Sequence, residues 1–478
     1  MDESLHACLP SQLLVSLSRR DFLCSALMLP ALGRAAQSSR PAAPGNRFVE
    51  YGDIEAILRS GAFPLPAGLT AAAWPRWVRD RDAEIRSRVQ KGEEDTLANF
   101  VLFGVSFTNQ RRLTPDIADP NEADRVIRSR VQSFVEAIWR PGNNERLALL
   151  GTLITRLGYS AVAGERRERL SEYVMGNVMR YLAERQQYEN NVARSLGNDT
   201  ASSFNTTAEL YNDRGLSVDT DFRPNYAIET ALAEIKRRGL LRSVRRVAVI
   251  GPGLDFTDKD SGFDHYPLQT VQPFAVVDSL LRLELASPKN LRVTLFDISV
   301  PTLDHIAKAV ARARVGQAYR LQLVLDRTRQ WNRNALDYWQ RFGAAIGSAV
   351  TPLPLPAQVV KADRRALNIR PEIVALMDPQ PLNVVLQRMD LRPEQQYDLV
   401  IGTNVLIYYN GFEQALALSN IDAMTASGGV FLTNDLSREY PGTRLRPGGV
   451  VQVDYSAKQA DQIQIYSRST FPLQLPPV

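Results

Sequence analysis

A short apolar run, Val247 to Ile250, ends directly at a glycine turn, Gly251-Pro252-Gly253. A continuous apolar run of this length is typical of a strand that is buried on both faces, as in a parallel sheet. Glycines directly after such a strand let the backbone turn sharply and approach a ligand closely. The stretch therefore predicts an α/β fold with a ligand site at the carboxyl end of its parallel strands.

Further strands follow in the order that a parallel sheet requires. Leu291–Ile298 is apolar and carries Asp297 near its end, where an acid can accept hydrogen bonds from both ribose hydroxyls of a nucleotide. Tyr397–Tyr409 and Gly428–Asp435 contain the next two apolar runs. Helical segments separate these strands, and this alternation over residues 241–478 indicates a parallel α/β sheet.

In this order the segments resemble the motifs of class I S-adenosylmethionine-dependent methyltransferases. VAVIGPG is similar to the first motif, FDI to the second, DLVIGTNVLIYY to the fourth, and GGVFLTND to the strand after it. The resemblance covers about the last half of the chain. It implies a Rossmann-like methyltransferase sheet with a terminal antiparallel strand, and S-adenosyl-L-methionine as cofactor. Two alternating runs, Gly449–Tyr455 and Gln462–Ser467, predict that antiparallel pair.

The candidate cofactor-binding residues lie at the predicted strand ends and in one polar segment upstream. They are Gly251, Gly253, Asp255, Asp297, Thr403, Asn404, Tyr211 and Arg214. Asp255 stands where the family often has a third glycine, and it could line the pocket or only satisfy turn amides. For Asp297 the alternative is a local turn or a helix cap.

Tyr211 and Arg214 belong to a polar, turn-rich segment, residues 200–224, which we expect to fold back over the site as a lid. The alternative is an interdomain loop with solvated charges.

Methyl transfer from a sulfonium needs alignment of the acceptor more than acid–base chemistry. His265 lies in an insertion, Leu254–Pro273, and could deprotonate an acceptor hydroxyl or amine, although a lone loop histidine is more often solvated. Tyr408 could shape the acceptor pocket, or could serve packing at a helix start. We name these two residues as the catalytic candidates.

The third strand of the sheet is not determined by the pattern. Both Gln358–Ala362 and Leu382–Leu386 fit, and the acid near adenine is accordingly Asp363 or Asp390.

Three regions are expected along the chain. Residues 1–45 read as a leader and linker, residues 46–240 as a mostly α-helical domain, and residues 241–478 as the methyltransferase domain. In the first region, SRRDFL at residues 18–23, an apolar run and a small-residue stretch resemble a bacterial twin-arginine signal peptide. This predicts a periplasmic or exported protein; if the leader is unused or is only a disordered tail, the protein is cytoplasmic.

The composition excludes several classes of function. A net charge of +5 over 478 residues, without a dense Lys/Arg run, gives no sign of nucleic-acid binding. No apolar segment is long enough to span a bilayer. Two cysteines near the N-terminus and three histidines make a metal site unlikely to form, so no metal is expected.

Our leading hypothesis is a methyltransferase that acts on an unknown small-molecule or protein acceptor. One alternative is a nicotinamide-dependent oxidoreductase, which also uses glycines and a strand-end acid, but this chain lacks the full GxGxxG pattern. The other is a non-catalytic exported binding protein on a methyltransferase-like scaffold. Export favours this last alternative, because S-adenosylmethionine is a cytoplasmic metabolite.

Overall fold

The computed structural model describes the chain from Gly45 to Arg468 with short gaps. The described residues are 45–114, 117, 119–159, 165–195, 215–216, 222–257, 263–327, 330–357, 359, 362–435, 439–457 and 459–468. The predicted leader lies outside them, as do Tyr211 and Arg214. Residues Pro44–Val478 form one compact unit.

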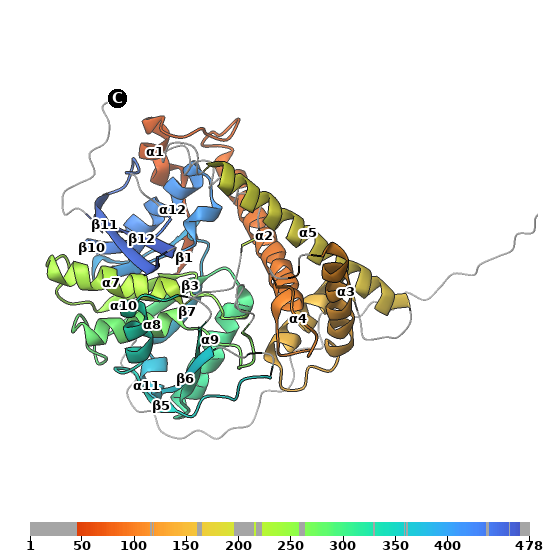
Figure 1. Ribbon diagram of the computed structural model, residues 1–478. Coiled ribbons are helices and arrows are strands. Elements are labelled where there is room, and N and C mark those ends of the chain that lie inside the picture. Colours follow the sequence, from red (N-terminus) through yellow and green to blue (C-terminus); the bar gives the residue numbers. More distant parts are fainter. Residues whose placement is uncertain are drawn as a thin grey trace, which may run out of the picture. The chain divides into compact units, whose positions relative to one another are not determined.

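A seven-stranded sheet forms the centre of this unit, with strand order β11-β12-β10-β9-β2-β3-β7 (Figure 1). The strands are β2 (Arg246–Ile250), β3 (Arg292–Asp297), β7 (Met377–Pro381), β9 (Tyr397–Ile401), β10 (Thr425–Thr433), β11 (Leu445–Ser456) and β12 (Gln459–Arg468). Strands β10, β9, β2, β3 and β7 pair in parallel, whereas β12 is antiparallel to β10 and to β11. The predicted Rossmann-like sheet and its terminal antiparallel pair are confirmed.

Strand β2 is central and is buried on both faces, as its apolar run predicts. Val247 and Val249 belong to one hydrophobic core, and Ala248 and Ile250 to a second core on the other face. This alternation follows from the two-residue period of a strand. The first core includes α7 (Arg223–Arg237), α8 (Gln272–Arg282) and α9 (Val300–Arg314), and the second includes α12 (Gly411–Met424).

The third parallel strand is β7, and both sequence-based alternatives for it are wrong. Asp363 lies instead in β6 (Ala362–Ile369), the middle strand of a separate antiparallel sheet with β4 (Tyr319–Asp326) and β5 (Gly347–Val350). Its carboxylate pairs with Arg327 at 3.0 Å. Asp390 follows β8 (Gln387–Met389) and pairs with Arg47 at 3.0 Å. Neither acid follows the third strand directly.

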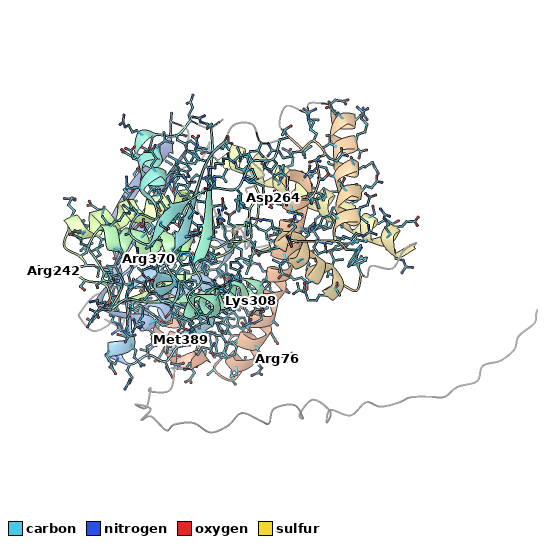
Figure 2. The ribbon with its side chains drawn as sticks, turned by 90° about the horizontal axis from the view of Figure 1, so that it is seen from below. Arg76, Arg242, Asp264, Lys308, Arg370 and Met389 are labelled. Atoms are coloured by element: carbon cyan, nitrogen blue, oxygen red, sulfur yellow. The ribbon has the colours of Figure 1, made fainter. Side chains whose placement is uncertain are left out.

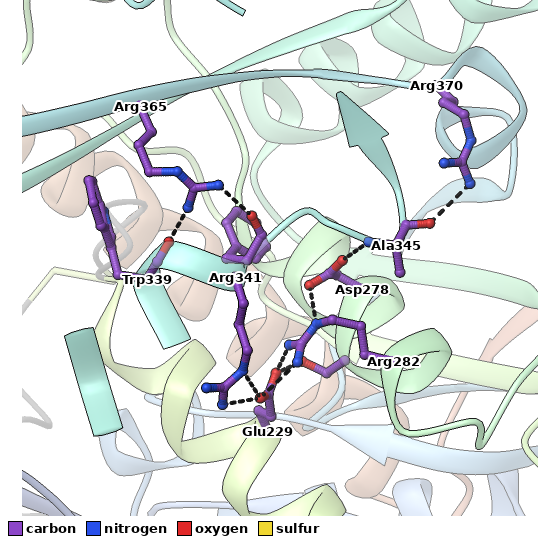
Figure 3. A network of polar contacts seen from close by, with 10 residues as sticks. Glu229, Asp278, Arg282, Trp339, Arg341, Ala345, Arg365 and Arg370 are labelled. Carbon is purple, nitrogen blue, oxygen red and sulfur yellow. Dashed lines mark hydrogen bonds and ion pairs between the residues drawn. The ribbon is translucent and has the colours of Figure 1, made fainter. Parts of the chain in front are cut away.

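A charge network joins the segment that forms β4, β5, β6 and the helix α10 (Arg333–Arg341) to α7 and α8, which cover the main sheet (Figure 3). Glu229 of α7, which is 4% exposed, pairs with Arg282 of α8 and with Arg341 of α10, the latter at 2.7 Å. Asp278 is fully buried; it pairs with Arg282 at 2.8 Å and accepts the amide of Ala345 at 2.9 Å. The network pairs the buried carboxylates of Glu229 and Asp278 with arginines from α8 and α10, of which Arg341 stays partly exposed.

The N-terminal residues are mostly helical, as predicted. Their helices are α1 (Glu55–Ser60), α2 (Trp74–Phe103), α3 (Pro120–Ala137), α4 (Glu145–Arg156) and α5 (Glu165–Ser195), after the short turn η1 (Tyr51–Ile54). Helix α2 packs against α3 and α5 (Figure 1). Strand β1 (Asn46–Phe48) pairs with β8, so the start of the described chain joins the second half. The predicted division into two folded domains stays a prediction. None of the helices in the described part of the chain is long and apolar enough to cross a bilayer.

Candidate functional site

Two predicted turn glycines follow β2 at the carboxyl edge of the sheet. Gly251 and Gly253 have φ angles of 66° and 60°, the left-handed region that only glycine enters without strain. A Cβ added to Gly251 would also lie 2.9 Å from Cγ2 of Val405, in the loop after β9. Bare backbone at this edge is therefore required both by the turn and by the neighbouring loop.

Asp297 ends β3 beside this turn. Its Oδ1 accepts the amide of Ser299 at 2.8 Å, and the backbone of Gly253 also donates to its carboxylate. Burial raises the pKa of Asp297 to about 6, although these backbone hydrogen bonds lower it. Asp297 thus has the local turn role that the sequence allowed, but it does not cap α9. The N-cap of α9 is Ser299, whose hydroxyl accepts the amide of Thr302.

The carboxylate of Asp297 forms no ion pair within the described residues. A partly buried carboxylate without a cation keeps its affinity for hydrogen-bond donors, and its two oxygens can accept more bonds than the local amides supply. The arrangement therefore suits a ligand that presents hydroxyl groups.

The loop after β9 brings Thr403 and Asn404 to the same edge. Thr403 is 5% exposed, and its hydroxyl accepts Nε2 of Gln272, the first residue of α8, at 2.9 Å. Asn404 has a φ of 56°, a left-handed conformation that costs a non-glycine residue on the order of 1 kcal/mol. Asn434 holds it there: its Oδ1 accepts the Asn404 amide at 2.8 Å, and its Nδ2 donates to Asn404 Oδ1 at 3.0 Å.

Asp435, the residue after Asn434, fixes the rest of this loop. Its Oδ2 accepts the amides of Val405 at 2.7 Å and Leu406 at 2.8 Å, and burial raises its pKa to about 6. The sequence analysis used this stretch only as a strand and missed both residues as parts of the site. Two polar residues directly after a buried strand, at the edge where ligands bind, are the signal that identifies them.

Tyr408 is partly buried, and its backbone carbonyl accepts Nη2 of Arg88 from α2 at 2.8 Å. The Arg88 guanidinium also lies 5.7 Å from the ring centroid of Tyr409, which is buried. Burial lowers the pKa of Arg88 and raises that of Tyr409. Helix α2 therefore holds the predicted catalytic tyrosine through its backbone.

Helix α2 contacts three of the loops at this edge. Asp82 accepts the side-chain amide of Asn383, after β7, at 2.8 Å, Arg88 holds the loop after β9, and the ring of Phe100 lies 5.8 Å from that of Phe256, after β2. A helix in this position covers the carboxyl edge of the sheet and restricts the access of water to it.

The two described residues in the middle of the predicted lid segment, Gly215 and Leu216, pack on α2. The Leu216 amide donates to the carbonyl of Arg88 at 2.9 Å. A Cβ on Gly92 would lie 1.8 Å from the Leu216 carbonyl oxygen, so the two backbones touch directly. Contact of this segment with a cofactor stays a prediction.

Arg146 of α4 holds the insertion that follows the glycine turn. It is 1% exposed and donates to the carbonyls of Asp255, Phe256 and Tyr266, the first at 2.9 Å. The Asp255 carboxylate accepts the hydroxyl of Tyr266 at 3.0 Å and Nε2 of Gln269 at 2.8 Å. These contacts favour a structural role for Asp255, in which its carboxylate binds other residues of the insertion, over a contact with the cofactor.

His265 lies in the same insertion and directly follows Asp264 in the sequence; Figure 2 labels Asp264. Asp264 is 1% exposed and accepts the amide of Val105 at 2.8 Å and the hydroxyl of Ser106 at 2.9 Å, which joins the insertion to the end of α2. The His265 ring packs edge-on against Tyr266, with centroids 5.3 Å apart. Its Nδ1 is buried without a hydrogen-bond partner in the described structure, and burial lowers its pKa to about 4. The imidazole is therefore neutral at pH 7, the form that a general base needs.

No family model and no curated protein matches the chain. Among solved structures it is similar to the N-methyltransferase NodS from Bradyrhizobium japonicum WM9, with 12% identity over 55% of this chain and 98% of that one, and a TM-score of 0.26. It is also similar to the magnesium protoporphyrin IX methyltransferase ChlM from Synechocystis PCC 6803, with 12% identity over 58% and 96% of the two chains and a TM-score of 0.25. The methyltransferase CcbJ from Streptomyces caelestis shares 14% identity over 52% and 79%, with a TM-score of 0.21. Identities and TM-scores this low support no conclusion about the activity of this chain.

Proposed function

We propose that this protein is an S-adenosylmethionine-dependent methyltransferase that acts on a small-molecule or protein acceptor. The observation that carries the proposal is the partly buried carboxylate of Asp297, which forms no ion pair with the described residues, next to the left-handed glycine turn. The glycines leave the backbone bare where a nucleoside would lie, and the carboxylate offers oxygen atoms to a pair of ribose hydroxyls. The residues present therefore fit this cofactor.

S-adenosylmethionine supplies a methyl group that its positive sulfur already activates. Asp297 would hold the ribose end, and Gly251 and Gly253 would admit the cofactor close to the backbone. Thr403 and Asn404, which Gln272 and Asn434 hold in place, would face the other end from the loop after β9. Helix α2 would keep water from the edge, and the fixed loops would align an acceptor with the methyl group.

His265 and Tyr408 remain the proposed acceptor-side residues. The neutral imidazole of His265 would take a proton from an acceptor hydroxyl or amine, and Tyr408 would shape the pocket from the loop after β9.

The antiparallel strand β12 favours this function over the nicotinamide-dependent alternative, whose sheet does not require such a strand. Titration of the full chain by calorimetry with S-adenosylmethionine, S-adenosylhomocysteine and NAD tests the choice. We expect both sulfur nucleotides to bind, binding to be lost in Asp297→Ala, and NAD not to bind. Binding of NAD alone would replace the proposal with the oxidoreductase, and no binding at all would leave the non-catalytic scaffold.

We also propose, on the basis of residues 18–23, that the leader directs export from a bacterium through the twin-arginine system; an exported protein would be the non-catalytic binding protein, and an unused leader would leave the methyltransferase in the cytoplasm. A fusion of the leader to a reporter that is active only after twin-arginine transport tests this. A signal confined to the cytoplasm would reject export.

A further inference from the structure

The hydrogen bonds around Asn434 fix the orientation of its carboxamide. Its Oδ1 accepts the backbone amide of Asn404 at 2.8 Å, so the oxygen faces the loop after β9. Its Nδ2 donates to Asp461 Oδ2 at 3.2 Å and to the side chain of Asn404 at 3.0 Å. A backbone N–H can only donate and an ionised carboxylate can only accept, so both contacts require this orientation.

The orientation of Asn434 in turn fixes that of Asn404. The atom of Asn404 that meets the Asn434 nitrogen is its Oδ1, so its Nδ2 is the branch that faces away from Asn434. No atom of the described residues accepts the two N–H bonds of this Nδ2, and Asn404 is exposed. The groups that Asn404 leaves open at the candidate cofactor edge are therefore hydrogen-bond donors.

Thr403, the preceding residue, is oriented in the same sense from a different element. Its hydroxyl accepts Nε2 of Gln272, the first residue of α8, so the hydroxyl hydrogen is left to donate. Within the described part of the chain this hydrogen has no acceptor. Two neighbouring residues, held from α8 and from the end of β10, thus both present donors to the same edge.

Asp461 holds Asn434 from the antiparallel strand β12. Its register partner in β11 is Val453, and β12 runs against β10, so Asp461 lies near the carboxyl edge of the parallel strands. Its Oδ1 accepts the Gln462 amide at 2.8 Å, and its Oδ2 also accepts the Tyr455 hydroxyl at 3.3 Å. The left-handed backbone of the residue that Asn434 holds is a strain that persists only where such contacts enforce it, and strain of this kind is common at binding sites.

We infer that the methyl acceptor is an oxygen compound whose oxygen, as a carboxylate or a phenolate, accepts Nδ2 of Asn404, and that Asn434 and Asp461 position this donor. An anionic oxygen forms the stronger, charge-assisted bond with an N–H donor. An amine would bring further N–H donors to an edge that itself offers donors, so it would be selected against. The inference rests on the proposed methyltransferase function, because it names the substrate class of that reaction.

The step is a displacement at the methyl carbon. The acceptor oxygen uses one electron pair to form the new O–C bond, the S–C bond breaks, and its electron pair stays on the sulfur, which becomes a neutral thioether. A carboxylate has no proton to lose, whereas a phenol first gives its proton to a base, the role proposed for His265. The bond from Asn404 holds the oxygen in place and leaves it another electron pair for the attack.

Two neutral single-ring probes separate the ligand classes. Acetophenone offers only an acceptor oxygen, whereas aniline mainly offers N–H donors. Each is titrated by ligand-observed NMR against the full chain saturated with S-adenosylhomocysteine. We expect acetophenone to bind about fivefold more tightly than aniline, the effect of one neutral hydrogen bond. Equal affinities, or tighter binding of aniline, would overturn the inference.

The double variant Asn434→Asp, Asp461→Asn reverses the orientation without changing the net charge. The new carboxylate at position 434 still accepts the Asn404 amide and now also accepts its Nδ2, and the new carboxamide at position 461 donates to that carboxylate. Asn404 then presents its Oδ1, so aniline should bind about fivefold more tightly than acetophenone. A network with a merely structural role would weaken both probes alike, and an unchanged ratio of their affinities would therefore reject the positioning role.

Asn404→Asp is a second test, in case the double variant does not fold. Asn434 still donates to the new carboxylate, whose outer oxygen replaces the donor, so acetophenone should bind about fivefold more weakly while aniline does not. Equal losses for the two probes would contradict the inference. Asp454→Asn is the control: it removes a carboxylate of β11 that bonds to Gln452 at 3.3 Å, and the ratio should stay that of the wild type.

Calorimetry with S-adenosylhomocysteine precedes every titration. If it does not bind the wild type, the proposed function fails and the inference fails with it. If it binds and the two probes bind equally, only the oxygen acceptor is rejected.

Discussion

Replacing Asp297 by asparagine separates a ligand-binding carboxylate from a merely structural one. Burial raises the pKa of Asp297 from 3.8 to about 6. At about 1.4 kcal/mol for each pH unit, this rise means that ionising the folded protein costs about 3 kcal/mol more than ionising the unfolded chain. Asparagine removes that cost, and the pKa of about 6 already includes the hydrogen bonds from the amides of Gly253 and Ser299.

We therefore expect Asp297→Asn to stabilise the fold by about 2–3 kcal/mol at pH 8. The sign follows from proton binding: between pH 4 and pH 6 the folded protein holds more protons than the unfolded chain, so the wild type loses stability as the pH rises through this interval. Below pH 4 the aspartate is neutral in both states, and the advantage of the variant should disappear. Urea unfolding at pH 4 and at pH 8 measures both values.

The same variant should bind S-adenosylhomocysteine at least tenfold more weakly at pH 8, because charge-assisted bonds to the ribose hydroxyls are lost. A variant that is destabilised by more than about 1 kcal/mol at pH 8, yet binds the nucleotide normally, would refute the reasoning and leave Asp297 a turn residue. Thr302→Val serves as a control, since it removes a hydroxyl of the same helix start, which donates to Ser299 Oγ at 3.0 Å, without touching the carboxylate.

Three further variants test the loops around the site. Asp435→Asn should lose a strong acceptor for the amides of Val405 and Leu406 and weaken the binding of S-adenosylhomocysteine. Because burial raises the pKa of Asp435 to about 6, the stability of this variant relative to the wild type should improve as the pH rises from 4 to 6. A stability difference that does not change with pH in urea unfolding would contradict this. Gly251→Ala should lower the free energy of unfolding by about 1–2 kcal/mol, because its φ is positive, and should displace Val405. Gly316→Ala is the control: Gly316 has a φ of 85° but open space for a Cβ, so this variant should lose stability without losing nucleotide affinity. Arg146→Met should lower the free energy of unfolding by about 3–5 kcal/mol, because three buried carbonyls lose their donor; a melting temperature equal to that of the wild type would show that the insertion is held by other contacts.

The sequence by itself determined the centre of the sheet and its carboxyl edge. The segments that form β2, β3 and β9 are apolar because both faces of a central parallel strand are buried. These strands can therefore be predicted from the sequence without tertiary information. The alternating runs of β11 and β12 are also apparent from the sequence, although only β11 shows a buried and an exposed face, around Val453 and Tyr455, whereas β12 is buried on both faces from Ile463 to Tyr466. Glycine and aspartate at the strand ends mark the edge where a ligand would bind.

The tertiary structure alone decided the third strand. Strand β7 reads MDPQP and lies at the end of the sheet, where it has one neighbour and is mostly exposed. An edge strand tolerates proline and polar residues, so it leaves no apolar run to find. Of the two more apolar segments that the sequence offered, one is described only at Val359 and at Ala362, where β6 of another sheet begins, and the other forms the turn that follows β7.

The residues that hold the site in shape also came only from the structure. Arg146 binds carbonyls more than 100 positions away, Arg88 binds the carbonyl of Tyr408 from 320 positions away, and Asn434 holds Asn404 from a neighbouring strand end. Such contacts depend on which backbone groups the fold leaves without partners, and any arginine or asparagine in the chain could in principle satisfy them. A local pattern encodes the burial of a strand, whereas long-range polar partners are fixed only when the whole chain has packed.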